Sequence, residues 1–522
     1  IDLVRVQAEA RPEKAFVFDS TVSLSYAELH EQALRLALGL HRAGLRQGDR
    51  VAVQLPNWAE FVMITAALSR IGAILVPIMP IYRDDEVGFV LQHSGAKAAI
   101  TCEEFKGFRY IDMFAELQKS SPELGSLITV RGSGTHGATA LEDLVLAGDL
   151  ATVESELPPA PSPDDGFMIV YTSGTTSRPK GCFHTFNTVR ASAEAIVVSL
   201  GYGEDDVQFG PSPITHATGL VTSCLMPLLV GASSHLMESW DPEDGLRRIE
   251  KHGCTVSVTA TAFLQMLMGA YDADKHDAGS IRFWVCAGSP IPSAVVRKAT
   301  DLLSGGQVLS LYGRSENFLT TMCTREDPPE RSATSDGSAV AGAEVKVVGL
   351  DGAEVPRGQE GDIAYRGPSH MLEYFHDDEQ TQALFTPDGF SRSGDLGVMD
   401  ADGYVRVTGR LKDIIIRGGL NISAREIEEQ LIDHPSVANV AVVSMPDERL
   451  GEKVCAYVVL APSASSLTLA EVAEFLQERK VATPKLPERL ELIGALPMTA
   501  SGKVRKHVLR DDVAGKLGSV AG

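Results

Sequence analysis

Short apolar runs and helical segments alternate along the first two thirds of the chain, and this alternation constrains the fold most strongly. Residues 27–47 place apolar side chains at helical spacing, and a short apolar run bounded by Asp49 and Pro56 follows them. Further runs have the length and composition of buried strands: 73–78, 97–101, 167–171, 255–259, 282–287 and 307–311. Strands that alternate with helices form parallel sheets covered by helices on both faces. The sequence therefore predicts the α/β class.

The pattern of apolar and turn-forming residues changes at about residue 340. The stretches AEVKVVGLDG, GDIAYRG and GYVRVTG have short strands and Asp-Gly or Gly turns, which predict an antiparallel barrel or meander. After GRLKDIIIRGG, an amphipathic helix, further strands and a helix opened by the capping box of Thr468 and Glu471 indicate a compact α+β unit. We expect an N-terminal domain at 1–410, with two parallel-rich, helix-covered sheets and a small β-barrel-like subdomain, and a mobile C-terminal domain at 411–522.

The charge of the chain excludes some classes of partner. With 47 basic and 69 acidic residues, the formal net charge is −22. The negative electrostatic field of such a chain repels nucleic-acid backbones and anionic lipid surfaces, so neither is expected as a partner. A small anion would need a local basic site to bind. The most apolar stretch is interrupted by Arg70, Pro77 and Pro80, so we expect no membrane span and see no leader. Seven scattered cysteines without a CxxC pair are typical of reduced thiols in a cytoplasmic protein.

The stretch YTSGTTSRPKG, residues 171–181, predicts an anion-binding loop after a buried strand. Its backbone N–H groups and hydroxyls suit phosphate oxygens, and Lys180 adds a mobile positive charge. The donors are Thr172, Ser173, Gly174, Thr175, Thr176 and Ser177. The stretch is not a Walker loop, because Pro179 stands where that pattern requires glycine. A polar turn between a strand and a helix remains the alternative.

This loop resembles the phosphate-binding signature of the adenylate-forming superfamily, which includes acyl- and aryl-CoA synthetases, peptide-synthetase adenylation domains and luciferases. Five further motifs agree with the superfamily in order: PSPITHATG (211–219), CAGSPIP (286–292), LYGRSEN (311–317), SRSGDLG with GRLKDIIIRGGLNISAREIE (391–428), and LPMTASGKVRK (496–506). The resemblance covers nearly the whole chain. It implies that a carboxylate attacks the α-phosphate of ATP to give acyl-AMP and pyrophosphate, and that a thiol, usually of coenzyme A, then displaces AMP.

The resemblance also implies catalytic and metal-binding roles. Lys503 matches the lysine that bridges the attacking carboxylate and the α-phosphate, and Arg410 matches an arginine that holds ribose and phosphate. Glu316 matches the acid that coordinates Mg²⁺, and Thr175 is the second expected metal ligand. Taken alone, the surroundings of Lys503 are typical of a solvated surface turn, and Glu316 could be the charge at a helix N-terminus.

The remaining nucleotide contacts follow from the same motifs. Asp395 resembles the aspartate that accepts both ribose hydroxyls, and a turn aspartate before glycine is its structural alternative. The hydroxyl of Ser315 is expected at the α-phosphate. The adenine slot and its neighbourhood are assigned to Ala287, Gly288, Ser289, Tyr312 and Gly313.

The resemblance places a hinge and a coenzyme A passage in the GRLKDIIIRGGLN motif. Lys412 occupies the hinge position, about which the C-terminal unit is expected to rotate between the two steps. Gly418 and Gly419 would line a narrow passage for the pantetheine arm, where a side chain would be an obstruction.

The acyl pocket implied by the resemblance is mostly apolar. Its expected lining comprises His216, Ala217, Thr218, Phe263, Met266, Leu311 and Arg314, with Leu267, Ser310 and Phe318 nearby. Such a lining favours a medium-chain, alicyclic or aromatic monocarboxylic acid. His216 is either a gate beside the acyl group or a hydrogen-bonded histidine under a loop. Arg314 departs from the family pattern and either forms a salt bridge, steadies the carboxylate or contacts a polar substituent.

The sequence thus predicts an ATP- and Mg²⁺-dependent acyl-CoA synthetase that uses coenzyme A. One alternative is an acyl-AMP ligase that loads a carrier-protein thiol, and another is a non-catalytic AMP-binding sensor. The expected partners are small molecules, and similar proteins are commonly homodimers.

Overall fold

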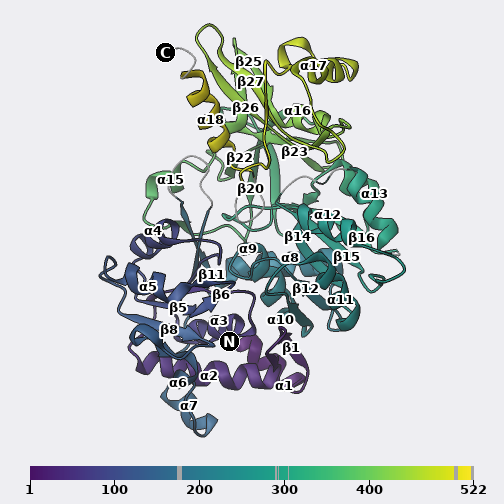
Figure 1. The fold of residues 1–522 in the computed structure, drawn as a ribbon. Helices are drawn as coiled ribbons and strands as arrows, with labels where there is room; N and C mark the ends of the chain where they lie inside the picture. Colours follow the sequence, from purple (N-terminus) through teal and green to yellow (C-terminus); the bar gives the residue numbers. More distant parts are fainter. Residues whose placement is uncertain (173–178, 289–290, 292, 304, 499–503, 519–522) are drawn as a thin grey trace. The chain divides into compact units, whose positions relative to one another are not determined.

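A computed structural model describes residues 1–172, 179–288, 291, 293–303, 305–498 and 504–518, and its contacts divide the chain into two compact units (Figure 1). Unit 1 contains Ile1–Thr172, Pro179–Glu344 and Arg366–Ala383. The described residues of unit 2 are Val345–Tyr365, 384–498 and 504–518. The domain boundary at residue 410, which we drew from motifs, stays a prediction.

The first sheet of unit 1 contains eight described strands in the order β21-β11-β10-β4-β3-β5-β8-β9. From β10 to β9 neighbouring strands are parallel, whereas β11 and β21 continue the sheet antiparallel. The strands are β3 (Arg50–Gln54), β4 (Ile74–Pro77), β5 (Ala98–Cys102), β8 (Ser126–Val130), β9 (Thr139–Ala140), β10 (Gly166–Tyr171), β11 (Gly181–Thr185) and β21 (Glu373–Tyr374). The consecutive residues Val51, Ala52 and Val53 are all fully buried, so helices cover both faces as predicted.

The second sheet of unit 1 contains nine described strands in the order β18-β17-β16-β15-β14-β12-β13-β1-β2. The strands from β16 to β1 are parallel. The strands are β1 (Ala15–Phe18), β2 (Ser23–Ser25), β12 (Val207–Gly210), β13 (Ser233–Leu236), β14 (Val256–Ala260), β15 (Phe283–Ala287), β16 (Gln307–Tyr312), β17 (Thr321–Met322) and β18 (Ser338–Ala339). The carboxyl ends of β12, β14, β15 and β16 therefore lie at one edge, which is where open α/β sheets bind ligands.

Helices connect the strands of unit 1, as the alternation in sequence predicts. The longer ones are α1 (Asp2–Ala10), α2 (Tyr26–Arg42), α3 (Ala59–Ile71), α4 (Asp84–Ser94), α5 (Tyr110–Gln118), α8 (Phe186–Leu200), α11 (Pro242–His252), α12 (Thr261–Ala270) and α13 (Ser293–Leu302). The short elements are β6 (Glu104–Phe105), β7 (Phe108–Arg109), η1 (Thr135–Gly137), α6 (Leu141–Leu144), α7 (Leu150–Glu156), α9 (Ala217–Leu220), η2 (Val221–Leu225), α10 (Met226–Val230), α14 (Pro329–Thr334) and α15 (Asp378–Gln382).

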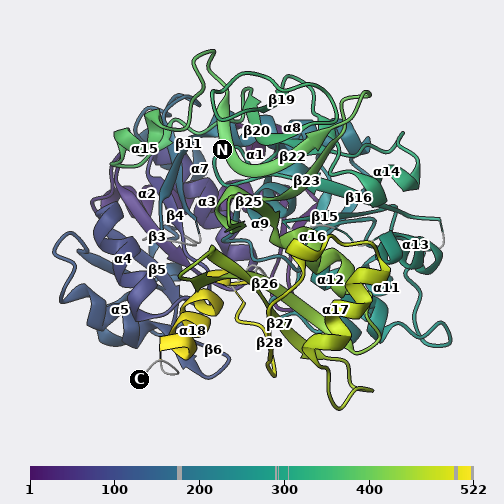
Figure 2. The same ribbon diagram turned by 90° about the horizontal axis from the view of Figure 1, so that it is seen from above.

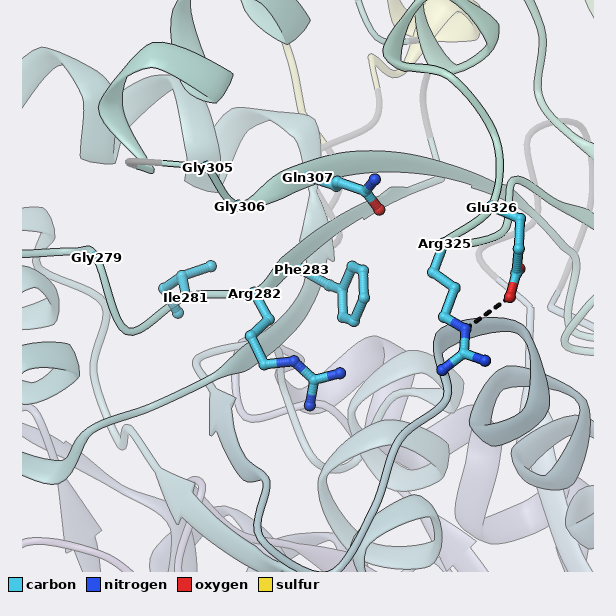
Figure 3. Close-up of a pocket in the computed structure, with 9 residues that line it drawn as sticks. All are labelled: Gly279, Ile281, Arg282, Phe283, Gly305, Gly306, Gln307, Arg325 and Glu326. Atoms are coloured by element: carbon cyan, nitrogen blue, oxygen red, sulfur yellow. Dashed lines mark hydrogen bonds and ion pairs between the residues drawn. The ribbon is translucent and has the colours of Figure 1, made fainter.

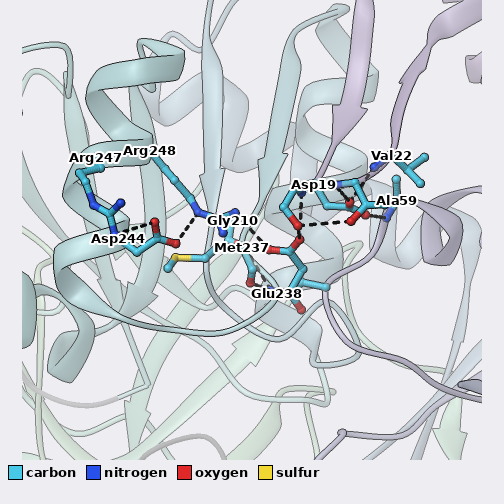
Figure 4. Close-up of polar contacts among 12 residues, drawn as sticks. Asp19, Val22, Ala59, Gly210, Met237, Glu238, Asp244, Arg247 and Arg248 are labelled. Atoms are coloured by element: carbon cyan, nitrogen blue, oxygen red, sulfur yellow. Dashed lines mark hydrogen bonds and ion pairs between the residues drawn. The ribbon is translucent and has the colours of Figure 1, made fainter. Parts of the chain in front are cut away.

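A buried carboxylate ties the two sheets of unit 1 together. Asp19, just after β1, accepts the N–H of Val22 at 2.9 Å and the N–H of Ala59, at the start of α3, at 3.0 Å (Figure 4). Arg131, just after β8, donates to Asp19 and to Glu60, both at 2.6 Å. Buried charges are tolerated when they are paired and hydrogen-bonded, so this network fixes strand ends of both sheets.

Unit 2 contains two antiparallel-rich sheets. The first has the order β19-β20-β22-β23 and comprises β19 (Glu344–Val348), β20 (Glu360–Arg366), β22 (Ser391–Met399) and β23 (Val405–Arg410). The α+β part that follows comprises η3 (Leu411–Asp413), β24 (Ile414–Arg417), β25 (Leu420–Ser423), α16 (Ala424–Leu431), β26 (Val437–Asp447), β27 (Gly451–Leu460), α17 (Leu469–Glu478), η4 (Thr483–Lys485), β28 (Arg489–Leu492) and α18 (Lys506–Gly518). The predicted capping box of Thr468 and Glu471 opens α17.

Both faces of the β26–β27 pair are buried, and the two faces contact different helices. Val442 and Val454 belong to a cluster with residues of α16 and α17, whereas Val443 and Tyr457 belong to a cluster with residues of α18. Figure 2 shows α18 and α17 on opposite sides of these strands. Alternate residues of a strand point to opposite faces, so this segregation is the period-two pattern of a strand covered on both sides.

All seven cysteines are buried free thiols, as the sequence predicts. Among the described residues, no helix is long and apolar enough to cross a membrane.

Candidate functional site

The glycine- and threonine-rich stretch begins and ends on two adjacent strands. Residues Ser173, Gly174, Thr175, Thr176 and Ser177 lie outside the described residues. At its ends, the N–H of Thr172 donates to the carbonyl of Lys180 at 2.9 Å, and the N–H of Lys180 donates to Thr172 Oγ1 at 3.2 Å. β10 is therefore followed along the chain by its antiparallel partner β11, and not directly by a helix.

Tyr374 brings the lysine of this loop and the predicted metal ligand together. Its hydroxyl donates to Glu316 Oε1 at 2.5 Å. Lys180 Nζ lies 4.1 Å from the centre of the Tyr374 ring. Tyr374 lies in β21, opposite Cys182 of β11. A residue that sequence reasoning did not single out thus links two residues that it did.

The surroundings of Glu316 keep its carboxyl group ionised. Partial burial by itself raises the pKa of Glu316, but the charge of Arg314, the hydrogen bond from Tyr374 and the charge of Lys180 together hold the pKa below its ordinary value. Burial raises the pKa of Tyr374, so the phenol stays protonated and remains a donor. Burial also raises the pKa of Cys182, which is therefore a neutral thiol behind the site.

A single carboxylate of this kind fits a magnesium ion held mainly by substrate phosphates. Among the described residues, no group of three or more His, Cys, Asp or Glu side chains could hold a metal by itself. Mg²⁺ binds oxygen and usually takes one or two carboxylates together with phosphates and water. Ionised Glu316 meets that requirement.

His184 positions the turn that carries Ser315 and Glu316. Its Nε2 lies 2.8 Å from the Ser315 carbonyl, which can only accept, so Nε2 carries the proton. The ring of Phe318 stacks on the imidazole with centroids 4.3 Å apart. Burial lowers the pKa of His184 to about 4, so the ring is neutral at physiological pH. No periodic pattern marks this histidine, and its partner is far away in sequence.

The LYGRSEN turn folds back closely on itself. A Cβ at Gly313 would lie 1.8 Å from the Phe318 carbonyl oxygen, so no side chain fits at this position. Arg314 Nε donates to Asn317 Oδ1 at 3.2 Å, which braces the same turn. Its role toward the acid stays a prediction.

The expected adenine slot lies at the carboxyl ends of two paired strands. Ala287, the last residue of β15, is opposite Leu311 of β16, and Tyr312 ends β16. Gly288 follows Ala287 with a φ of +77°, a conformation that favours glycine. Ser289 lies outside the described residues. The strand edge thus has the small residues and the aromatic ring that a purine slot needs.

The expected acyl residues follow β12 and β14 or lie at the end of β16, at the same sheet edge. His216 Nδ1 accepts the N–H of Thr218 at 3.3 Å and so caps α9. Ala217 and Leu311 are buried, and Phe263 packs against Trp240 with ring centroids 4.9 Å apart. Met266, also on α12, is 44% exposed.

The predicted ribose ligands in unit 2 are paired with each other. Asp395 and Arg410 lie opposite one another on β22 and β23, and Arg410 Nε is 2.9 Å from Asp395 Oδ1. Asp362 on β20 holds the bulged part of β22 that precedes Asp395. It accepts the N–H of Gly394 at 2.9 Å, the hydroxyl of Ser393 at 3.2 Å and Arg392 Nε at 3.0 Å. Sequence reasoning did not single out Asp362: it lies in the GDIAYRG stretch, but none of the six family motifs includes it.

Gly418 and Gly419 form the two-residue turn between β24 and β25. Their φ angles are +56° and +88°, and the flanking residues Arg417 and Leu420 are paired. Hairpin turns with two positive φ angles favour glycine, so local geometry alone accounts for both residues. Lys412 is exposed within η3, and Lys503 lies outside the described residues. The passage, the hinge and the catalytic lysine therefore stay predictions.

A pocket of about 570 Å³ lies at the amino ends of β15 and β16, at the opposite end of these strands from the site (Figure 3). It is lined by Gly279, Ile281, Arg282, Phe283, Gly305, Gly306, Gln307, Arg325 and Glu326. Its two arginines are paired: Arg282 with Asp206 and Arg325 with Glu326, both at 2.7 Å. None of the predicted site residues lines this pocket.

Two family profiles match the chain. The AMP-binding enzyme profile matches residues 4–375, and the AMP-binding enzyme C-terminal domain profile matches residues 426–503.

Curated relatives match along nearly the whole length. A medium-chain fatty-acid–CoA ligase of Escherichia coli (strain K12) is 38% identical over 512 residues, covering 98% of this chain and 89% of the relative. A salicyl-AMP ligase / salicyl-S-ArCP synthetase of Mycobacterium tuberculosis is 34% identical over 491 residues, covering 93% and 85%.

Solved structures match to a similar extent. The anthranilate CoA ligase AuaEII in complex with anthranoyl-AMP has a TM-score of 0.88 and 26% identity, covering 99% of this chain and 97% of that one. ATP-bound MatB from Rhodopseudomonas palustris has a TM-score of 0.87 and 28% identity, with 98% of each chain covered.

Proposed function

Because the chain belongs to the AMP-binding enzyme family and is an AMP-forming acid–CoA ligase, we propose that its acid is a monocarboxylic acid with an apolar body, with medium-chain fatty acids as the preferred class. The observation that carries this proposal is the set of apolar side chains at the ligand-binding edge of the second sheet, which includes Ala217, Phe263 and Leu311. The similarity to the medium-chain ligase of Escherichia coli supports the chain length, and alicyclic and aromatic acids remain within the same class.

The residues of the YTSGTTSRPKG stretch, together with Glu316, would bind and orient the phosphates of ATP. Thr172, together with the hydroxyls and N–H groups of Ser173, Gly174, Thr175 and Thr176, would donate to phosphate oxygens, and Lys180 would neutralise part of their charge. Glu316, held ionised by its surroundings, would bind Mg²⁺ with Thr175. When bound, this ion neutralises the phosphate charge that would otherwise repel the attacking carboxylate.

The remaining residues would hold the nucleoside and the acid. Asp395 would accept the ribose hydroxyls while Arg410 remains beside it, and Tyr312 would stack on the base. Lys503 would bridge the attacking carboxylate and the α-phosphate, so that its charge balances both anions in the first step.

We propose coenzyme A as the natural thiol, with its pantetheine arm passing the Gly418–Gly419 turn. A carrier-protein thiol is the second candidate, and the similarity to the salicyl-AMP ligase supports it. Cytoplasmic location, magnesium dependence and a homodimer belong to the same proposal.

The test is pyrophosphate release with a series of acids, each with and without coenzyme A. The series includes butyrate, hexanoate, octanoate, decanoate, benzoate, salicylate and the dicarboxylate malonate. Burial of each methylene is worth about 0.8 kcal/mol, so kcat/KM should rise about fourfold per methylene until the apolar space is filled. We expect octanoate or decanoate to be the best substrate and malonate to be inactive.

Each alternative gives a different result in this assay. A flat dependence on chain length, or a preference for malonate, would overturn the acid class. Acyl-AMP that forms but is not converted to a thioester by coenzyme A would favour a carrier-protein acceptor. Absence of pyrophosphate release with every acid of the series would also overturn the acid class. Glu326→Gln, which changes an exposed carboxylate far from the site, is the control and should leave every rate unchanged.

A further inference from the structure

We propose that Tyr374 is a positioning residue for the magnesium-bound nucleotide: its hydroxyl fixes one oxygen of Glu316, and its ring face fixes the ammonium group of Lys180. The inference rests on the proposed function and deepens it, because it states how the chain arranges a negative and a positive group around the phosphates. Each of the two contacts is present in the described structure.

Tyr374 is firmly anchored, as a positioning residue must be. Its side chain is 2% exposed, and its N–H donates to Thr381 Oγ1 at 2.9 Å. On either side of it, the N–H of Leu372 donates to the Phe183 carbonyl and the N–H of Phe375 donates to the Gly181 carbonyl, both at 2.8 Å. The backbone of Tyr374 is thus held to the strand that begins where the phosphate loop ends.

The hydroxyl of Tyr374 restricts how Glu316 can bind a cation. An ionised carboxylate has two oxygens with two lone-pair sites each, and the hydrogen bond from Tyr374 takes one site of Oε1, so Oε2 would be the more accessible oxygen for a metal. The same bond restricts rotation of the Glu316 side chain. The backbone of Glu316 is held as well, because the N–H of Met371 donates to the Glu316 carbonyl at 2.7 Å. The carboxylate is therefore oriented before the nucleotide binds.

The ring of Tyr374 restricts Lys180 in a different way. Lys180 Nζ lies 4.1 Å from the ring centre, within the range of a cation–π interaction. Its second contact is Gln380 Oε1 at 3.4 Å. Lysine side chains carry high rotamer entropy, so a ring that holds the ammonium group reduces the entropy lost when it meets a phosphate. One side chain thus positions two groups of opposite charge.

Two substitutions separate the two contacts. Tyr374→Phe removes the hydroxyl and keeps the ring, whereas Tyr374→Leu removes both. Tyr457→Phe is the matched control, because the buried Tyr457 of unit 2 also donates to a carboxylate, Asp512 Oδ2, at 2.6 Å. Binding of ATP is measured by calorimetry with Mg²⁺ and with a chelator, and crystal structures of the metal-free variants show the position of Glu316.

We expect Tyr374→Phe to weaken binding of ATP with Mg²⁺ about tenfold, the loss of one hydrogen bond to a charged acceptor, and to leave metal-free ATP binding within about twofold. Its metal-free structure should show the Glu316 carboxylate rotated. Tyr374→Leu should weaken both kinds of binding, since Lys180 also loses its contact. Tyr457→Phe should change neither.

An equal effect of Tyr374→Phe with and without Mg²⁺, or an unmoved Glu316 in its crystal structure, would overturn the inference alone. Absence of pyrophosphate release from the wild-type protein would instead overturn the proposed function. The binding comparison would still decide the role of Tyr374 in that case, because it needs no turnover.

Discussion

Asp362→Asn should loosen the first sheet of unit 2, although the change is nearly isosteric. The carboxylate of Asp362 is 5% exposed and accepts from the N–H of Gly394, the hydroxyl of Ser393 and the guanidinium of Arg392. An amide can accept on one side only. If its oxygen keeps Gly394 and Ser393, its NH₂ group faces the N–H of Arg392, and a donor then meets a donor.

The size of the effect follows from these contacts. A hydrogen bond between charged partners contributes about 1.5–3 kcal/mol. The side chain of Arg392 is 26% exposed, so water recovers part of the loss, and about 2 kcal/mol remains. This corresponds to a roughly 30-fold increase in the population of the open state. Because the N–H of Asp395 donates to Ser393 Oγ, the disturbance reaches the predicted ribose ligand.

Hydrogen exchange followed by mass spectrometry is the appropriate assay. The three tryptophans, Trp58, Trp240 and Trp284, all belong to unit 1, so their fluorescence does not report on this sheet. We expect amides of β20 and β22 to exchange roughly 30-fold faster in Asp362→Asn.

The matched control for this experiment is Glu360→Gln, on the same strand. Its exposed carboxylate accepts one hydrogen bond, from the Thr408 hydroxyl at 2.6 Å. An exposed contact of this kind contributes less than about 1 kcal/mol, so exchange should change by less than about fivefold. Equal exchange in the two variants would refute the reasoning about the buried carboxylate.

Four further predictions follow from the fold and the motifs. Burial and the neighbouring His252 lower the pKa of His235 from 6.5 to about 4, so the unfolded chain takes up a proton first and the free energy of unfolding falls as the pH drops from 6.5 to 4. His235→Phe should reduce this fall by about 3 kcal/mol, measured by thermal melts across this pH range. An unchanged pH dependence would contradict the prediction. Gly418→Ala places a side chain at positive φ and should lower the free energy of unfolding by about 1–2 kcal/mol, measured by urea unfolding. Equal urea midpoints for the variant and the wild-type protein would contradict this. Lys503→Ala should abolish most acyl-AMP formation but spare thioester formation from supplied acyl-AMP; equal losses in the two half-reactions would speak against its bridging role. Lys412→Pro should slow thioester formation more than adenylation in single-turnover assays, and the reverse order would exclude the hinge.

Local features of the fold could be predicted from the sequence because nearby residues determine them. The apolar run 97–101 is β5 at Ala98–Cys102, and the capping box of Thr468 and Glu471 opens α17. Both signals depend on residues a few positions apart, where side-chain periodicity and hydrogen-bond geometry act directly.

Non-local features could not be predicted in this way. β21 has two residues and no periodicity, yet it completes a sheet whose other strands come from the first part of the chain. The partners of His184 and Asp362 are chosen by the tertiary fold, so no spacing in sequence marks them. Motif resemblance placed Asp395 and Arg410 in one site, but only the register of β22 and β23 shows that the two side chains pair.

The two-residue strand β21 also has a consequence for biosynthesis. Its partner β11 is complete at Thr185, whereas Tyr374 emerges from the ribosome much later. Until then, the edge of β11 is an unpaired row of N–H and C=O groups, and such edges are templates for aggregation. The edge of β11 therefore lacks its pairing strand until Glu373 and Tyr374 have been synthesised.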